Sequence, residues 1–218
     1  LGGGVIGDMG GWTAASYMRG MDFIQIPTTL LSMVDASVGG KLAIDFSGYK
    51  NLVGLIKDPL AVIIHTDFLG TLPPRLLKSG MAEVLKHGLI ADKDYWDDVK
   101  EYTRKKTIPW DQWIYESVLI KKKVTETDPL EKGLRKILNF GHTIGHALES
   151  YSLDHDADPL THGEAIAIGM ICESFVSMKA GMISEEALKE ITEGILSVFR
   201  KEERTLPSLD DIKIMLSR

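Results

Sequence analysis

Cysteine and excess positive charge are both scarce in this sequence, and each shortage removes a class of protein. A single cysteine, Cys172, stands among 218 residues, which excludes a disulfide framework or a cysteine-rich zinc module and favours a reducing, cytoplasmic setting. The formal net charge of -6 argues against nucleic acid as the main partner, because a phosphate backbone requires a basic footprint. Any anionic ligand must therefore meet a local cluster of lysine and arginine.

Long apolar runs are missing too. The longest, Ala165–Met178, is interrupted by Glu173 and is too short and too polar to span a bilayer, and no secretory signal opens the chain, so no membrane partner is expected. Hydrophobic residues make up 44% and charged residues 26%, as in an ordinary globular protein.

A glycine-rich turn, Gly2–Asp8, follows the first residue at once. Because such turns normally receive a preceding strand, we expect the sequence to be a fragment.

The apolar pattern predicts an α/β segment followed by an all-α segment. Short β-branched runs at 23–26 and 61–64 predict buried strands, and segments 27–31 and 38–41 predict loops and short helices. From Leu72 onward helical spacing takes over, and it predicts helices over 75–89, 110–125, 164–178, 184–199 and 208–216. The helix over 164–178 is apolar nearly all round, which predicts a central, buried position. These patterns divide the chain into residues 1–71 and 72–218.

Three segments carry metal-binding residue types. His142 and His146 are four residues apart and share one face of a helix, His162 opens the apolar helix, and Glu83 lies on a separate helix with Lys86 one turn further on. Two imidazoles and a carboxylate suit a catalytic zinc-like ion that keeps an open position for a substrate oxygen. Spacing alone leaves open the alternative that these are structural histidines of the core.

Basic residues in glycine-rich or polar contexts are candidates for anion binding: Arg19, Lys41, Lys50, Lys86, Lys121 and Arg135. Lys41 and Lys50 follow glycines and resemble anion cradles, with ordinary surface lysines as the alternative. Lys121, inside a run of three lysines, has the pattern of surface charge. The Gly2–Asp8 turn would suit a pyrophosphate at a helix N-terminus, but it lacks a clean G-x-G-x-x-G spacing, so a tight structural turn is the alternative.

Taken in order, these segments resemble the 3-dehydroquinate synthase family of the sugar phosphate cyclase group. The matching segments are Gly2–Asp8, Tyr17–Gly20, Pro27–Leu31, Met33–Asp35, Gly39–Lys41, Lys50–Gly54, Gly80–Lys86, Gly133–Arg135, Leu138–His146 and His162–Glu164. The resemblance implies a partial NAD-binding α/β domain over 1–71 and a helical metal and substrate domain over 72–218, with the active site between them. The family's opening strands and C-terminal section are absent. We therefore expect this chain alone to bind NAD poorly or to convert substrate poorly.

The resemblance also assigns roles by position. The implied ligands of zinc or cobalt are Glu83, His142 and His162. The implied catalytic residues are His146, Glu131, Lys86, Lys121 and Asp35. The implied substrate contacts are Arg19, Lys41, Asn51, Arg135 and Asn139, with Arg19 reaching the site of a neighbouring subunit of a homodimer. The implied NAD contacts are Gly3, Gly4, Val5, Asp8, Thr28, Thr29, Lys50, Phe68, Leu69, Gly70 and Thr71.

The implied activity is that of a carbon-oxygen lyase of the shikimate pathway of aromatic amino acid biosynthesis. It converts 3-deoxy-arabino-heptulosonate 7-phosphate to 3-dehydroquinate and phosphate by transient oxidation with NAD, β-elimination, re-reduction and aldol closure. One alternative is a related cyclase that makes 2-deoxy-scyllo-inosose or a valiolone from a substrate without a carboxylate. Arg135, Lys41 and Lys121 argue against this alternative, because three basic residues favour an acidic substrate. Others are a metal- and NAD-dependent oxidoreductase of the glycerol dehydrogenase kind and a non-catalytic remnant.

Overall fold

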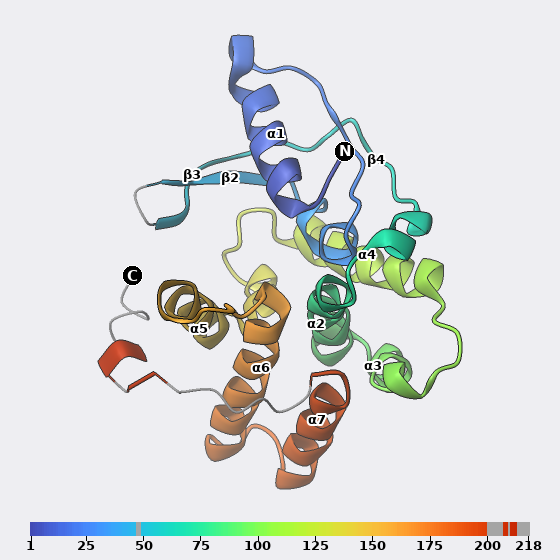
Figure 1. Ribbon diagram of the computed structural model, residues 1–218, viewed down its shortest axis with the longest axis vertical. Helices are drawn as coiled ribbons and strands as arrows, with labels where there is room; N and C mark the ends of the chain where they lie inside the picture. Colours follow the sequence, from blue (N-terminus) through green and yellow to red (C-terminus); the bar gives the residue numbers. More distant parts are fainter. Residues whose placement is uncertain (47–48, 200–206, 209, 213–218) are drawn as a thin grey trace. The chain divides into compact units, whose positions relative to one another are not determined.

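The computed structural model describes residues 1–46, 49–199, 207–208 and 210–212, without the side chains of Asp45, Tyr49 and Lys50. The chain forms two compact units (Figure 1). Leu1–Gly80 and Pro109–Arg135 make the first unit, and Met81–Ile108 and Lys136–Arg218 make the second. The functional division into residues 1–71 and 72–218 stays a prediction, and we note that the helix after Pro109 belongs to the first unit.

The first unit combines short strands with helices. Its elements are α1 (Gly4–Ser16), η1 (Tyr17–Arg19), β1 (Ile24–Gln25), η2 (Ser32–Ala36), β2 (Lys41–Phe46), β3 (Tyr49–Ile56), β4 (Ala61–Val62), η3 (Thr66–Thr71) and α4 (Trp110–Thr127). Strands β1 and β4 pair in parallel, with Ile24 opposite Ala61, so both predicted strands are confirmed in shorter form. Their predicted burial is wrong, because Ile24 is 52% exposed and Ala61 is also exposed. Helix α1 packs on β2 and on η2, and α4 packs on η2.

An antiparallel hairpin of β2 and β3 is a feature that the sequence analysis missed. Segment 38–41 was expected to be loop or short helix, but β2 begins at Lys41, where Lys41 lies opposite Ile56. Lys50 and Asn51, whose position after Gly48 resembles an anion cradle, lie in β3. Leu42, Ile44 and Phe46 alternate with other residues, which is the period of a strand, and of the three Leu42 is buried whereas Phe46 is 57% exposed.

The second unit is helical. It holds most of α2 (Pro74–Ala91), then α3 (Lys93–Val99), η4 (Tyr102–Arg104), α5 (His142–His155), α6 (His162–Lys179) and α7 (Glu185–Val198), and η5 (Leu134–Asn139) leads into it. Helix α6 lies between α5 and α7 and packs on both (Figure 1). The helices predicted over 75–89, 110–125 and 184–199 are confirmed, and the Ser184 hydroxyl caps α7 by accepting a bond from the Ala187 N–H at 3.2 Å. The helix predicted over 208–216 falls largely outside the described residues. Within the described ranges, no helix is both long and apolar enough to cross a membrane.

Helix α6 is buried mainly over its first half, where Ile168 is nevertheless 38% exposed. Ala165, Ile166 and Met170 have no exposed surface, whereas Phe175 is 48% and Val176 59% exposed. The prediction of a helix buried all round is therefore wrong for the second half, because burial depends on which neighbours pack there. At the crossing with α5, a Cβ on Gly145 would lie 3.1 Å from the Cα atom of Ile166, so glycine lets the two backbones approach closely.

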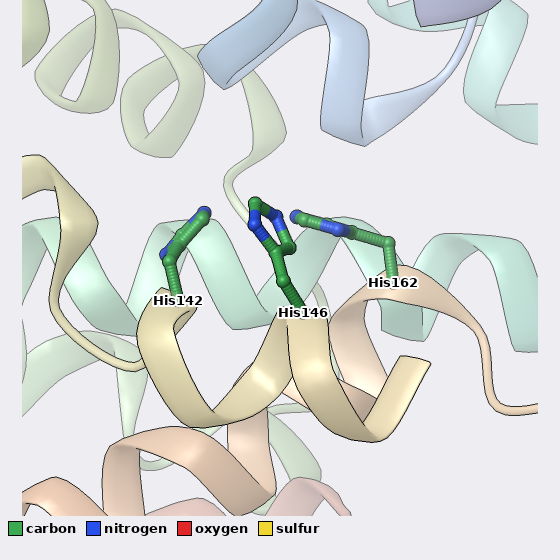
Figure 2. A group of neighbouring side chains, drawn as sticks. All are labelled: His142, His146 and His162. Atoms are coloured by element: carbon green, nitrogen blue, oxygen red, sulfur yellow. The ribbon is translucent and has the colours of Figure 1, made fainter. Parts of the chain in front are cut away.

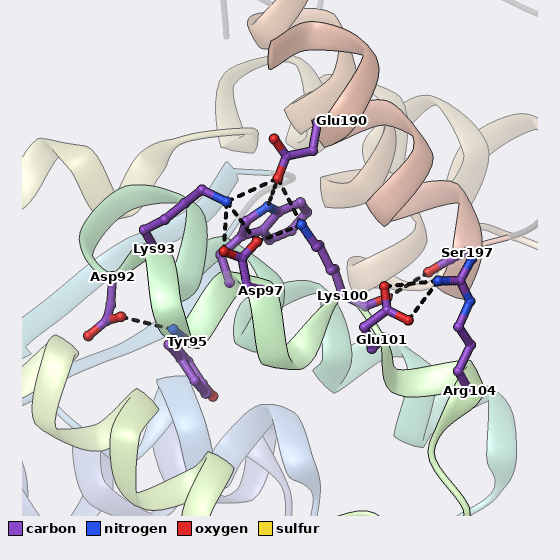
Figure 3. Close-up of polar contacts among 10 residues, drawn as sticks. Asp92, Lys93, Tyr95, Asp97, Lys100, Glu101, Arg104, Glu190 and Ser197 are labelled. Carbon is purple, nitrogen blue, oxygen red and sulfur yellow. Dashed lines mark hydrogen bonds and ion pairs between the residues drawn. The ribbon is translucent and has the colours of Figure 1, made fainter. Parts of the chain in front are cut away.

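Hydrogen bonds and ion pairs of Glu190 connect helix α7 to α3 and to Lys100, the residue that follows α3 (Figure 3). The Oε1 atom of Glu190 accepts bonds from Nζ of Lys100 at 2.9 Å, Nε1 of Trp96 at 3.0 Å and Nζ of Lys93 at 3.2 Å. Asp97 accepts from the same two lysines. The bond from Lys100, followed by those from Trp96 and Lys93, lowers the pKa of Glu190 to about 2.

Replacing Glu190 by Gln should lower the free energy of unfolding at neutral pH by up to about 1 kcal/mol, the usual range for exposed ion pairs. Because the pKa of Glu190 is lower in the folded chain than its ordinary value, this stabilisation is present above about pH 4.5 and is lost as the pH falls toward 2. Urea unfolding at pH 7 and at pH 2 measures it. The control is Glu193→Gln at an exposed position of the same helix, and an equal loss at both pH values would contradict the prediction.

Candidate metal centre and anion-binding residues

Three helices of the second unit bring Glu83, His142 and His162 together. The Oε1 atom of Glu83, on α2, lies 3.5 Å from Nε2 of His142, at the start of α5, and 3.5 Å from Nε2 of His162, at the start of α6. Figure 2 shows the imidazoles of His142 and His162 converging with that of His146, one turn further along α5. The three residues that the resemblance assigned as metal ligands therefore share one place in the second unit.

Glu83 is a fully buried carboxylate, so its negative charge needs a compensating positive charge nearby. Its side chain has no exposed surface, and neither oxygen has a hydrogen bond of ordinary geometry among the described residues. The ammonium of Lys86, one turn along α2 and 1% exposed, forms an ion pair with its Oε2 atom. Burial raises the pKa of Glu83, but Lys86, together with His162 and His142, outweighs burial and holds that pKa well below its ordinary value. Glu83 is therefore ionised and can bind a cation.

The far nitrogens of both histidines face acceptors. Nδ1 of His142 lies 3.2 Å from the carbonyl oxygen of Phe140, and Nδ1 of His162 lies 3.5 Å from Oε2 of Glu149. Burial keeps the pKa of His142 below its ordinary value. Burial acts in the same direction on His162, but Glu149 and then Glu83 outweigh it and raise the pKa to about 9. Both rings thus direct Nε2 toward the carboxylate of Glu83.

His146 belongs to the same cluster. One nitrogen from each of His142, His146 and His162 lies within 4.8 Å of the others, so the structure allows a set of three imidazoles as well as the set that includes Glu83. The ring centroid of His146 is 5.0 Å from that of His142 and 5.7 Å from that of His162. His146 is therefore close enough to handle a proton on anything bound at this centre.

In the first unit, Lys121 is a buried cation and does not lie on the surface as its lysine-rich neighbourhood suggested. Its Nζ lies 2.6 Å from Oδ1 of Asp35 and also donates to the Asp35 carbonyl oxygen. Lys121 comes from α4 and Asp35 from η2, and only 7% of Lys121 is exposed. Two residues assigned as catalytic are thus held against each other.

The loop that follows α4 holds Glu131 and Arg135. The carboxylate of Asp128 accepts bonds from the backbone N–H groups of Gly133 at 2.7 Å, Lys132 at 3.0 Å and Arg135 at 3.1 Å, which lower its pKa. Glu131 forms an ion pair with Lys41 of β2. The Arg135 guanidinium is 4% exposed and donates to the carbonyl oxygens of Pro129 and Gly39, each at 3.0 Å. Both assigned substrate residues, Lys41 and Arg135, therefore have protein partners here.

Backbone strain coincides with several of the assigned residues. Among the described residues, the non-glycine positions with positive φ are Met18, Arg19, Asn51 and Glu131. Asparagine tolerates this region, but Arg19 at φ 70° and Glu131 at φ 57° are held there at a cost of about 1 to 2 kcal/mol each. Such costs persist where surrounding structure imposes them, often at functional sites.

The residues assigned to NAD fall at two places in the first unit. Gly3 and Gly4 line a hollow of about 240 Å³ at the start of α1, together with Gly7, Gln25 and Ser32. Thr28 and Thr29 adjoin it, since the Thr28 N–H donates to the Gly2 carbonyl and a Cβ on Gly3 would lie 3.2 Å from Thr29. Val5 and Asp8 are on α1 outside that lining, and Phe68–Thr71 end η3. The side chain of Lys50 lies outside the described part.

The other three assigned substrate residues lie at the surface. Arg19 is exposed at the end of η1, Asn51 is exposed in β3, and Asn139 is exposed at the end of η5. Sequence reasoning did not find Glu149. A signal was available, because Glu149 follows His142 by seven residues and His146 by three, which places all three on one face of a helix.

Two family profiles match the chain: 3-dehydroquinate synthase N-terminal over residues 1–79 and 3-dehydroquinate synthase C-terminal over residues 80–206. A curated 3-dehydroquinate synthase from Streptococcus pyogenes serotype M6 is 46% identical over 204 residues, which is 92% of this chain and 55% of the relative. One from Clostridium botulinum (strain Alaska E43 / Type E3) is 42% identical over 214 residues, or 97% of this chain and 60% of the relative. The chain therefore spans little more than half the length of these relatives.

Solved structures of related cyclases share the fold. A 2-epi-5-epi-valiolone synthase from Streptomyces hygroscopicus with NAD⁺ and Zn²⁺ bound matches with a TM-score of 0.88 and 27% identity, covering 99% of this chain and 61% of that one. A 2-deoxy-scyllo-inosose synthase with carbaglucose-6-phosphate, NAD⁺ and Co²⁺ matches with a TM-score of 0.85 and 29% identity, covering all of this chain and 59% of that one. Both profiles, the curated relatives and the clustered glutamate and histidines agree, and the chain belongs to the 3-dehydroquinate synthase family.

Proposed function

We propose that this chain carries the metal and substrate chemistry of a 3-dehydroquinate synthase, a lyase of the shikimate pathway. The reaction converts 3-deoxy-arabino-heptulosonate 7-phosphate to 3-dehydroquinate and phosphate. The observation that carries the proposal is the convergence of Glu83, His142 and His162 in the core of the helical unit. The Oε1 atom of Glu83 lies 3.5 Å from the Nε2 atom of each histidine. Identity of 42 to 46% to curated synthases, against 27 to 29% to the two other cyclases, favours this substrate.

A divalent cation suits the donor set. Glu83 offers buried oxygens that lack a hydrogen bond of ordinary geometry within the described part of the chain, and His142 and His162 present Nε2 on the same side. One oxygen and two nitrogen donors fit zinc, and cobalt also fits, as in the two cyclase structures. A bound cation of this kind supplies Lewis acidity to substrate hydroxyls. The ammonium of Lys86 keeps Glu83 ionised and so ready to bind it.

The first unit would supply the dinucleotide and anion contacts. NAD, when bound, accepts a hydride and returns it within one turnover, and Gly3, Gly4, Thr28 and Thr29 border the hollow that would receive it. The phosphate and carboxylate of the substrate would be oriented by Lys41, Lys121 and Arg135. For this, the substrate would replace the carboxylate and carbonyl groups that these three side chains now contact. Glu131 and His146 are the groups proposed to move protons.

We also propose a cytoplasmic homodimer, with Arg19 contributing to the site of the neighbouring subunit. The support is indirect. Arg19 is exposed and held at a positive φ of 70°, which suits a residue that acts outside its own fold. A single cysteine suits a reducing compartment.

Replacing Glu83 by Gln should remove most of the bound metal, because the amide keeps the volume of the side chain but not the charge that attracts the cation. The parent chain should hold about one equivalent of zinc after loading, measured by elemental analysis. His155→Ala is the matched control, since His155 lies on the same helix as His142 and its Nδ1 faces the Tyr151 carbonyl oxygen at 2.8 Å. Equal metal content in all three proteins would contradict the proposed centre.

Replacing His146 by Ala should separate its proton-handling role from metal binding. If Glu83 completes the ligand set, this variant keeps its zinc and loses turnover by about 100- to 10,000-fold, the range for loss of a general acid or base. If the three imidazoles form the set, the variant loses the metal as well. Elemental analysis and the turnover number of the loaded enzyme, measured on one preparation, distinguish the two outcomes.

The reaction itself is tested with a purified protein that contains this chain and spans the full length of the curated relatives, supplied with NAD, zinc and heptulosonate phosphate. Phosphate should be released with no net accumulation of NADH, because the hydride returns to the product in each cycle. Net NADH would indicate an oxidoreductase of the glycerol dehydrogenase kind, and a preference for a sugar phosphate without a carboxylate would indicate one of the other cyclases. Absence of phosphate release from that longer protein, once it is shown to bind both zinc and NAD, would overturn the proposal.

A further inference from the structure

The imidazole of His162 is held between two carboxylates. Its Nε2 atom lies 3.5 Å from Oε1 of Glu83, and its Nδ1 atom lies 3.5 Å from Oε2 of Glu149. These nitrogens are on opposite sides of the ring, so the two glutamates contact different edges of it. Figure 2 shows that the Nε2 edge of His162 is directed toward the other two histidines.

Glu149 comes to this position through the helical repeat. It follows His146 by three residues on α5 and is itself buried, with 9% of its surface exposed. Its partner His162 is the first residue of α6, whose start is fixed by a capping box between Thr161 and Glu164. Burying a carboxylate costs several kcal/mol unless a donor or cation compensates, so Glu149 has a physical reason to remain at this imidazole.

The geometry separates Glu149 from the proposed ligands. A metal ligand must reach the cation on the Nε2 side, where Glu83 lies, whereas the carboxylate of Glu149 lies at the Nδ1 side of the same ring. His142 shows the same arrangement with a different acceptor, because its Nδ1 faces the Phe140 carbonyl oxygen at 3.2 Å and its Nε2 faces Glu83. Each proposed imidazole ligand therefore has an acceptor behind it, a backbone carbonyl in one case and a carboxylate in the other.

We propose that Glu149 is a positioning residue for the metal centre. Its carboxylate accepts a hydrogen bond from the Nδ1–H group of His162 and so orients Nε2 of that ring toward the cation site. The inference rests on the metal site of the proposed function. Acceptors of this kind fix the tautomer and orientation of a ligating histidine and increase its basicity, and their loss typically weakens metal binding by about 10- to 100-fold.

The test measures the dissociation constants for Zn²⁺ and Co²⁺ by competition with a chelator, on the parent chain, Glu149→Ala, Glu149→Gln and Glu193→Gln. Glu149→Ala should bind about 10- to 100-fold more weakly, and Glu149→Gln, which still accepts a hydrogen bond but lacks the charge, should lose less. The visible absorption spectrum of the Co²⁺ form should change in Glu149→Ala. Glu193→Gln, an equal charge change at an exposed position of α7, should match the parent in both measurements.

The outcomes are distinct. Parent-like metal affinity and parent-like Co²⁺ spectra in both Glu149 variants would overturn the inference and leave Glu149 as a structural contact between α5 and α6. Complete loss of metal from both would make Glu149 a ligand, which also overturns it. A parent chain that binds no metal would defeat the proposed centre itself, and the inference with it. If circular dichroism shows that Glu149→Ala does not fold, Glu149→Gln decides the matter.

Discussion

The structure of the helical unit depends on compensating one buried negative charge. Glu83 has no exposed surface, and an isolated carboxylate in such a place would cost several kcal/mol. Lys86 compensates it from the same helix, while His142 and His162 approach from two others. The arrangement leaves Glu83 ionised but without a hydrogen bond of ordinary geometry among the described residues, which supports the proposal that this carboxylate binds a cation.

Close helix packing makes that convergence possible. Gly145 lets α5 come against Ile166 of α6, so the histidines at the starts of these helices lie with their ring centroids 5.5 Å apart. Acceptors behind the rings then select which nitrogen faces Glu83. The glycine sets the separation of the helices, and the carbonyl of Phe140 and the carboxylate of Glu149 set the direction of the rings.

In the first unit, cations that the family would use for an anionic substrate already have protein partners. Lys121 is paired with Asp35, Lys41 with Glu131, and Arg135 with two backbone carbonyls. Lys121 and Arg135 are buried, whereas the side chain of Lys41 is 55% exposed. A phosphate or carboxylate offers these cations the same chemistry as their protein partners. Positive φ at Glu131 and Asn51 shows that the backbone holds two of the assigned positions in unusual conformations.

The sequence by itself determined the local features: the pairs His142–His146 and Glu83–Lys86 on single helix faces, the capped start of α7, and two short strands. Those follow from helical and strand periodicity, which nearby residues alone decide. Only the tertiary structure decided that Lys121 is buried, that β2 and β3 form a hairpin, that α6 is exposed in its second half, and that Glu149 stands behind His162. The reason is physical, since burial and ion pairing depend on which residues distant in the chain pack together, and no local pattern encodes that choice.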